Sequence, residues 1–231
     1  MSAYLELSLC GTAISAGWLP FTSTKCNWQR GWGLLLLLLA SPAWAGFCYS
    51  DPSPSEPRHD FEFFAGYSPV SAMLIGTTTD RRFFLAGFGY SYRCWVWPSV
   101  SISYTGELMP AAVLLQPGQY LPQFVPAHAV YGFAVTPLGF TVDFARSHRV
   151  YPFLQTNEGI IASSEPIPIN VTGATGLNFL IDLGGGVRIK TGQRHAISIG
   201  YKFLHISNAF TSPVNPGVDN NVFYAGFSML K

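Results

Sequence analysis

The sequence predicts an all-β protein, an eight-stranded antiparallel β-barrel that spans a membrane. Three observations lead to this prediction. Charged residues make up only 11% of the 231 residues, whereas soluble domains contain roughly 25%. The chain is rich in residues of strands and tight turns, with 23 Gly, 18 Phe and 11 Tyr. Finally, apolar and polar side chains alternate over eight separate windows, which is the two-residue period of a β-strand.

The N-terminal region, residues 1–45, predicts a secretory signal peptide that is removed from the mature protein. Lys25 and Arg30 precede an apolar run at residues 34–39, and small residues then allow cleavage after Ala45. The alternative is a membrane anchor. The run is shorter than the roughly 20 apolar residues that cross a bilayer as a helix, so removal is favoured.

A proline-rich polar linker without periodicity follows at residues 46–60. The barrel is predicted over residues 61–231. Removal of the signal peptide leaves Cys48 and Cys94 as the only cysteines of the mature chain, in an oxidising compartment. A disulfide between these two residues is possible, and the sequence does not decide whether it forms.

The eight predicted strands follow one another along the barrel region. The clearest is the window 177–190, in which apolar residues share one parity and polar or small residues take the other. Eight strands of this kind suit a small membrane barrel, whose strands need roughly 9 to 11 residues to cross. The remaining windows are 61–67, 82–93, 99–107, 130–144, 150–161, 195–207 and 220–230.

A soluble lipocalin-like barrel has the same number of strands and is the alternative fold. Such a barrel encloses an apolar cavity and exposes charge, whereas here the less apolar face carries small and hydrogen-bonding residues that fit a narrow lumen. Asp182, Arg188 and Lys190 are predicted to form a charge network in that lumen. Together with the signal peptide, this pattern predicts a multi-pass barrel in the bacterial outer membrane.

Several classes of ligand are not expected. The net charge of +1 provides no general attraction for nucleic acid. The glycine run 184–186 lies inside an alternating strand and begins no helix, so close packing is expected there rather than a phosphate-binding loop. No metal site is predicted, because four histidines have no second ligand at a metal-like spacing: His59, His128, His148 and His195.

The last two strands carry residues suited to nucleophilic catalysis. The apolar parity of the window 195–207 leads to His205 and Ser207, which are therefore expected to project toward lipid. Residues two apart on a strand lie about 7 Å apart with parallel side chains, so the imidazole can take the hydroxyl proton. The apolar parity of the last strand, extended backwards, reaches Asp219, whose carboxylate can accept the second imidazole N–H and stabilise an imidazolium.

This motif resembles the signature of a known family. Residues 205–209, His-Ile-Ser-Asn-Ala, followed by residues 215–219, Asn-Pro-Gly-Val-Asp, are similar to the outer-membrane lipid A 3-O-deacylase family, PagL, of the acyloxyacyl hydrolase type. The resemblance is specific over the last two strands and covers the rest only in pattern. It implies that His205, Ser207 and Asp219 form a triad, that the ester-linked 3-hydroxyacyl chain of lipid A is hydrolysed, and that no metal or organic cofactor takes part.

Two residues depart from the family pattern. Asp219 stands where glutamate is typical, and Phe210 where glycine is typical. Aspartate is one methylene shorter, so the hairpin must bring it closer to the histidine, although aspartate serves in other triads. For the oxyanion, Asn208 and Asn215 are the candidate donors, through main-chain or side-chain N–H groups.

The expected partners are lipid A of lipopolysaccharide and the lipid of the outer membrane, and a homodimer remains possible. Four arginines are candidates to contact lipid A phosphates: Arg81, Arg82, Arg146 and Arg149. Two other functions remain open, because His-x-Ser arises easily by chance and residues 208–219 have the composition of an ordinary hairpin loop. They are a non-catalytic outer-membrane barrel with a structural or binding role and a soluble lipid-binding barrel.

Overall fold

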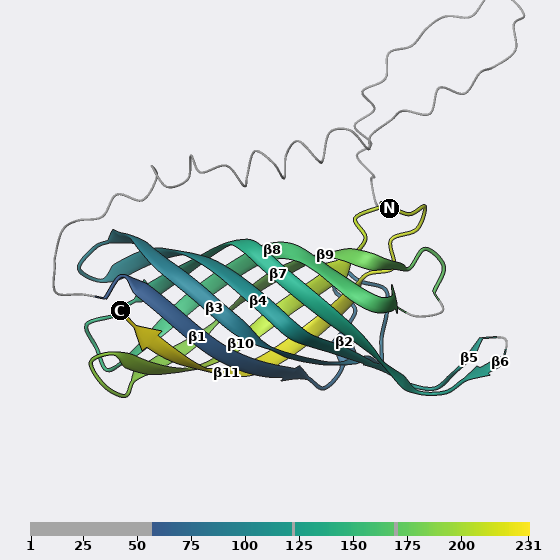
Figure 1. Ribbon diagram of the computed structural model, residues 1–231, viewed down its shortest axis with the longest axis horizontal. Coiled ribbons are helices and arrows are strands. Elements are labelled where there is room, and N and C mark those ends of the chain that lie inside the picture. Colours follow the sequence, from purple (N-terminus) through teal and green to yellow (C-terminus); the bar gives the residue numbers. More distant parts are fainter. Residues whose placement is uncertain (1–56, 122, 169–170) are drawn as a thin grey trace, which may run out of the picture.

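In the computed structural model, eight long strands close into one antiparallel barrel (Figure 1). The structure describes residues 57–121, 123–168 and 171–231. Each long strand pairs with the next along the chain, and the last pairs with the first, which confirms the predicted closed barrel. The long strands are β1 (His59–Ser68), β3 (Arg82–Val96), β4 (Val100–Gln116), β7 (His128–Phe144), β8 (Val150–Ile167), β9 (Thr175–Lys190), β10 (His195–Ser207) and β11 (Val218–Leu230), and the short ones are β2 (Ser71–Ala72), β5 (Gln119–Leu121) and β6 (Gln123–Val125).

All eight predicted windows are strands, and most extend beyond the predicted bounds. The largest extension is in β4, which was expected to end at residue 107 and continues to Gln116. Its pairing with β7 shifts between Met109 and Ala112, and this irregularity changes which parity faces inward. The alternation is lost at that point, which explains the early predicted end. No helix long and apolar enough to cross a membrane occurs among the described residues.

Of the N-terminal predictions, the structure tests only the start of the barrel, because the described residues begin at residue 57. Residues 1–45, the predicted signal peptide, and most of the linker 46–60 lie outside the described residues. The barrel begins two residues earlier than expected, because His59 and Asp60 already pair with β3. Cys94 is disulfide-bonded, whereas Cys48, with which the sequence left a disulfide open, lies outside the described residues.

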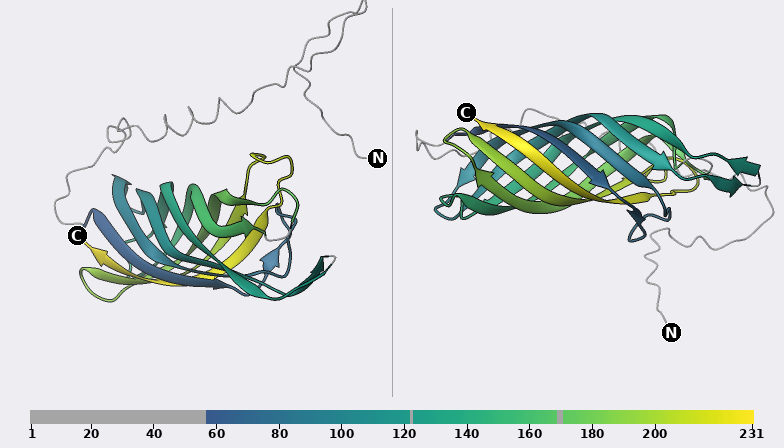
Figure 2. Two further views of the ribbon diagram at one scale, coloured as in Figure 1. Left: turned by 45° about the vertical axis from the view of Figure 1, so that its right-hand side comes forward. Right: turned by 90° about the horizontal axis from the view of Figure 1, so that it is seen from below.

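The two ends of the barrel differ in their connections. The end that holds the C-terminus, which we call the terminal end, has short turns at residues 97–99, 145–149 and 191–194. The opposite end, which we call the loop end, has longer connections, and one of them carries the β5–β6 hairpin beyond the barrel (Figures 1 and 2). Outer-membrane barrels show this asymmetry, with short turns in the periplasm and longer loops outside the cell.

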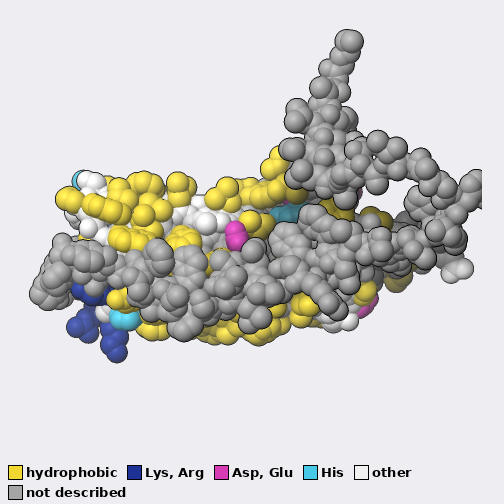
Figure 3. All heavy atoms as spheres, turned by 90° about the horizontal axis from the view of Figure 1, so that it is seen from above, with side chains coloured by type: hydrophobic (Ala, Val, Ile, Leu, Met, Phe, Trp, Pro, Cys, Tyr) yellow, Lys and Arg dark blue, Asp and Glu magenta, His cyan; other side chains and the backbone are white. Residues whose placement is uncertain are grey.

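The outer surface of the wall is apolar. Aromatic side chains on neighbouring strands pair across it, with ring centroids 5.2 Å apart for Phe61 and Tyr90 and 5.1 Å apart for Phe63 and Phe88. Figure 3 shows apolar side chains spread over the wall and basic side chains gathered at the terminal end. An apolar outer wall of this kind fits contact with lipid and argues against the soluble lipocalin-like alternative, which exposes charge.

The interior of the terminal half contains a charge network that includes Asp182 and Arg188 of the predicted set. Lys202 lies between Glu107, with which it forms an ion pair, and Asp182, whose Oδ2 is 3.4 Å from the lysine Nζ. Arg188 pairs with Asp143, with 3.2 Å between Nη1 and Oδ1. All these side chains are nearly inaccessible, and mutual pairing offsets the cost of burying their charges. Lys190, the third residue of the predicted set, instead donates a hydrogen bond to the Arg146 carbonyl.

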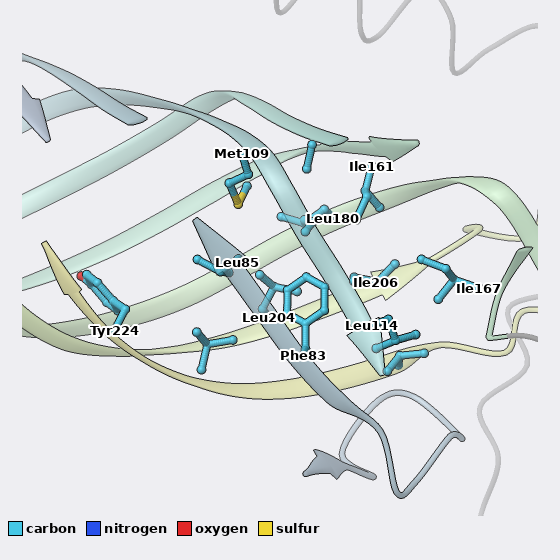
Figure 4. Packing of buried hydrophobic residues seen from close by; sticks show 14 of the residues in the cluster. Phe83, Leu85, Met109, Leu114, Ile161, Ile167, Leu180, Leu204, Ile206 and Tyr224 are labelled. Carbon is cyan, nitrogen blue, oxygen red and sulfur yellow. The ribbon is translucent and has the colours of Figure 1, made fainter. Parts of the chain in front are cut away.

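The interior of the loop half is apolar, which departs from the predicted polar lumen. On β10, inward-facing Lys202 is followed by inward-facing Leu204 and Ile206, and none of the three is more than 1% exposed. Apolar side chains from the other strands meet them inside the barrel (Figure 4). We call this set the apolar plug: Phe83, Leu85, Met109, Leu114, Ile161, Leu180, Leu204 and Ile206.

Candidate active site

His205 and Asp219 face each other across the ladder between β10 and β11. They are direct partners in the antiparallel register, and His205 Nδ1 lies 2.5 Å from Asp219 Oδ1. Side chains of directly opposed residues begin only about 4.5–5.5 Å apart at Cβ. This explains how the shorter aspartate reaches the ring without the extra methylene of the family's glutamate.

Ser207 lies two residues beyond His205, at the end of β10 and on the same face of the strand. Its ladder partner is Phe179 of β9. Both side chains have the outward parity of Ile197 and Ile199, as the sequence predicted. No hydrogen bond joins the Ser207 hydroxyl to the His205 ring in the described part of the chain, and such bonds often form only when a substrate is bound.

The site is nevertheless covered, which the sequence did not predict. His205 and Ser207 are each 8% exposed and Asp219 is 0% exposed. A bare lipid-facing wall would leave these positions as open as Ile199, which is 54% exposed. Another part of the chain must therefore lie over them.

The cover comes from the connection between β1 and β3, to which the sequence analysis gave no role. There β2 pairs with Asp219 and Asn220. The next main-chain N–H groups, those of Leu74, Ile75 and Gly76, donate to Asp219 Oδ2 at 2.8, 2.7 and 2.9 Å. We call residues 71–78 the acid-binding segment. Its only signal in the sequence is a short apolar run that ends in glycine, which a search for alternating strands passes over.

Two glycines allow the acid-binding segment to approach the histidine. A Cβ added at Gly76 would lie 2.5 Å from the Gly217 carbonyl oxygen, and one added at Gly217 would lie 2.6 Å from His205 Cε1. The N–H groups of Thr77 and Thr78 donate to that same Gly217 oxygen at 3.0 and 3.3 Å. The glycine of the family-like motif is thus the point where segment, hairpin and imidazole meet.

The predicted oxyanion residues organise the loop that follows Ser207. The main-chain N–H of Asn208 donates to Asn215 Oδ1 at 3.1 Å, and its Nδ2 donates to the carbonyls of Gly173 and Val214 at 2.7 and 2.9 Å. Asn208 therefore has no N–H group left for a substrate in this arrangement. The Nδ2 group of Asn215 donates to no protein acceptor among the described residues, so Asn215 stays a candidate.

The loop also explains why glycine is typical at position 210. Ala209 and Phe210 have φ angles of +47° and +60°, which lie in the left-handed region. Only glycine adopts this conformation without a steric cost. Phe210 accepts this conformation in an exposed position, where its side chain is 75% accessible.

Of the four arginines considered as phosphate contacts, only Arg82 is both exposed and at the loop end, where the candidate site lies. Arg146 and Arg149 belong to the turn between β7 and β8 at the terminal end, away from the candidate site. Arg81 is buried and donates to Gln116 Oε1 at 2.8 Å. Arg82 is exposed at the loop end. Within the described ranges no group of three or more His, Cys, Asp or Glu residues lies close enough together to hold a metal ion.

A closed barrel with an apolar outer wall, a histidine–carboxylate pair and a nearby serine defines a class, that of outer-membrane β-barrels with a candidate hydrolytic site. A family model described as Lipid A 3-O-deacylase (PagL) matches residues 85–228. The match spans more than half of the chain and includes both strands of the site. The chain belongs to the lipid A 3-O-deacylase (PagL) family, which is a family of hydrolases.

Solved structures share the fold. The crystal structure of the outer membrane enzyme PagL matches with a TM-score of 0.51 and 17% identity, over 71% of this chain and 97% of that one. The outer membrane protein OprG from Pseudomonas aeruginosa matches with a TM-score of 0.47 and 11% identity, over 76% and 97%. At 17% identity the likeness to the PagL structure concerns the fold alone. No curated protein matches this chain in sequence.

Proposed function

We propose that this protein hydrolyses the ester that links a 3-hydroxyacyl chain to lipid A, with Ser207 as nucleophile, His205 as general base and Asp219 as the orienting acid. The observation that carries the proposal is the buried His205–Asp219 hydrogen bond, two residues from a serine on the same face. A neutral imidazole with its proton held on Nδ1 presents a free Nε2 as base.

The chemistry follows from these positions. Ser207 Oγ attacks the ester carbonyl while His205 Nε2 takes the hydroxyl proton, and Asp219 stabilises the resulting imidazolium. The ester C–O bond then breaks, and the sugar hydroxyl leaves with the proton from Nε2. Water, deprotonated by the same nitrogen, cleaves the acyl-serine, which releases the 3-hydroxy fatty acid and restores Ser207.

The location of the site suits this substrate. Lipid A occupies the outer leaflet of the outer membrane, and the site lies on the wall of the barrel at the loop end. An ester at that depth would approach the partly covered Ser207, which is 8% exposed, from the side, so the substrate does not leave the bilayer. The exposed guanidinium of Arg82 at the same end is available for a lipid A phosphate.

Mass spectrometry of lipid A tests the reaction. The protein, Ser207→Ala and the loop variant Ser212→Ala would be expressed in the outer membrane of a strain that makes lipopolysaccharide. We expect the wild type and Ser212→Ala to remove one hydroxyacyl chain and Ser207→Ala to remove none. Intact lipid A beside folded wild-type barrel would refute the proposal and favour the non-catalytic alternative.

A fluorophosphonate probe tests the serine mechanism without the lipid substrate. The probe phosphonylates serines that an adjacent base activates, as the serine oxygen bonds to phosphorus and fluoride leaves. Wild type and Ser212→Ala should be labelled, and Ser207→Ala and His205→Ala should not. Equal labelling of Ser207→Ala would show that another residue is the nucleophile.

A further inference from the structure

The acid-binding segment is attached to the barrel at both of its ends. At its start, Ser71 and Ala72 continue the wall by pairing with β11. At its end, Thr78 forms a parallel bridge with Val218. The three amides that donate to Asp219 lie between these attachments, so their positions are defined by main-chain pairing on either side.

The hydrogen bonds from these amides offset the free-energy cost of burying a carboxylate in a wall that faces lipid. Asp219 is 0% exposed, and a buried charge without partners is strongly disfavoured. Its Oδ1 contacts the imidazole of His205, and its Oδ2 accepts all three main-chain bonds. Successive N–H groups that converge on one oxygen form an anion-binding nest, and here the anion is the proposed catalytic acid.

The same residues present an apolar surface outward. The side chains of Met73, Leu74 and Ile75 are 64%, 76% and 63% exposed. The residue that follows them, Gly76, packs closely against Gly217, which itself contacts the His205 ring. Three adjacent exposed apolar side chains at a lipid-facing position form a surface that suits acyl chains.

We propose that residues 71–78 are a positioning element for the site: the amides of Leu74, Ile75 and Gly76 hold Asp219 in the orientation that His205 requires, and the side chains of Met73, Leu74 and Ile75 bind the acyl chain being removed. The second half of this proposal rests on the proposed function. The first half concerns only the His205–Asp219 pair.

A matched pair of variants at one position separates the amide from the side chain. Ile75→Ala keeps the N–H group and loses the apolar side chain, whereas Ile75→Pro loses both. A misplaced catalytic group costs up to about a hundredfold in rate. We therefore expect kcat at saturating lipid A to be about ten- to a hundredfold lower in Ile75→Pro than in Ile75→Ala, and both variants should share the rise in KM that loss of the side chain causes. Equal kcat in the two variants would overturn the positioning role.

Proton NMR of the detergent-solubilised barrel gives a readout that needs no substrate. The proton shared by His205 Nδ1 and Asp219 should resonate far downfield in wild type and Ile75→Ala, and shift or disappear in Ile75→Pro. If the proline variant does not fold, Gly76→Ala replaces it, because its Cβ would lie 2.5 Å from the Gly217 oxygen and must displace the segment. An unchanged signal in these variants would refute the positioning role.

Substrates with different hydroxyacyl lengths test the apolar contact. The double variant Leu74→Ala/Ile75→Ala should raise KM by about tenfold for long chains and less for short ones, with kcat retained, because lost apolar contacts weaken binding. Unchanged KM and unchanged length preference would overturn the acyl contact. If the folded wild type cleaves no lipid A at all, the proposed function fails, and the NMR comparison still decides whether residues 71–78 position Asp219.

Discussion

The terminal half and the loop half of the barrel distribute polarity in opposite ways, and β10 shows both arrangements on one strand. In the terminal half, Ile199 faces lipid and Lys202 faces the lumen. In the loop half, His205 and Ser207 have the outward parity while Leu204 fills the interior. Along β10, the polar side chain therefore points into the barrel at Lys202 and out of it at His205 and Ser207.

This difference separates stability from chemistry. In the terminal half, buried charges are paired with one another, so their removal should affect folding. In the loop half, the apolar plug supports the wall from behind, because close-packed side chains leave little room for strands to shift. The reactive groups can then lie on the outer face, within reach of a lipid that never enters the barrel.

The largest difference should appear when one carboxylate in each half of the barrel is replaced by an amide. In Asp219→Asn the three main-chain N–H groups hold the amide oxygen and the amide NH2 faces His205 Nδ1, which imposes the wrong histidine tautomer and in serine triads costs roughly 10⁴-fold in kcat. Asp143→Asn, the matched change in the terminal half, removes a partner of Arg188 and should leave kcat of the folded protein unchanged. Turnover of purified barrels on lipid A measures both. A retained kcat in Asp219→Asn would remove the acid from the triad.

The next effect concerns the buried charges. Lys202→Met leaves Glu107 and Asp182 without their shared cation, and an uncompensated buried charge costs about 3–5 kcal/mol. Urea unfolding of barrels in lipid vesicles would measure the loss, and kcat of the folded fraction should not change. Addition of Glu107→Gln and Asp182→Asn to Lys202→Met should recover much of the stability. Failure of this rescue would contradict the ionic account of the terminal half.

A smaller effect is expected in the apolar plug. Leu204 is 0% exposed, and its truncation to alanine should cost about 2–4 kcal/mol through lost packing and a cavity. Ile199→Ala on the lipid-facing side of the same strand should cost less, because lipid chains can occupy the space that it leaves. Unfolding free energies of the two variants in vesicles provide the comparison. Equal losses would mean that the plug does not pack as tightly as the structure shows.

The barrel could be predicted from the sequence because one rule, the two-residue period, acts along most of each strand. The triad candidates followed from the same rule, since His205 and Ser207 share a parity and Asp219 extends that of the next strand. The rule stops at irregularities, so the part of β4 beyond residue 107 was not predicted, and neither was the apolar interior at Leu204.

The acid-binding segment could not be predicted for a different reason. Its contact with Asp219 joins residues about 145 positions apart, with Leu74 as one example, and it uses main-chain N–H groups that every residue except proline possesses. Side-chain identity therefore carries almost no signal of it. The hydrogen bonds of Asn208 were not foreseen for a similar reason, because its N–H groups donate to the Asn215 side chain and to the carbonyls of Gly173 and Val214.

The smallest predicted effect is a gain. Phe210 has a φ of +60°, a conformation that costs a residue with a Cβ about 1–2 kcal/mol, whereas glycine loses more chain entropy on folding. Phe210→Gly should therefore raise the unfolding free energy by about 0.5–1 kcal/mol, and Phe210→Ala should not, since it keeps the Cβ. Urea unfolding in vesicles distinguishes the two variants. A stabilisation shared by both would instead assign the cost to the exposed ring, and a KM change shared by both would place that ring in contact with the substrate.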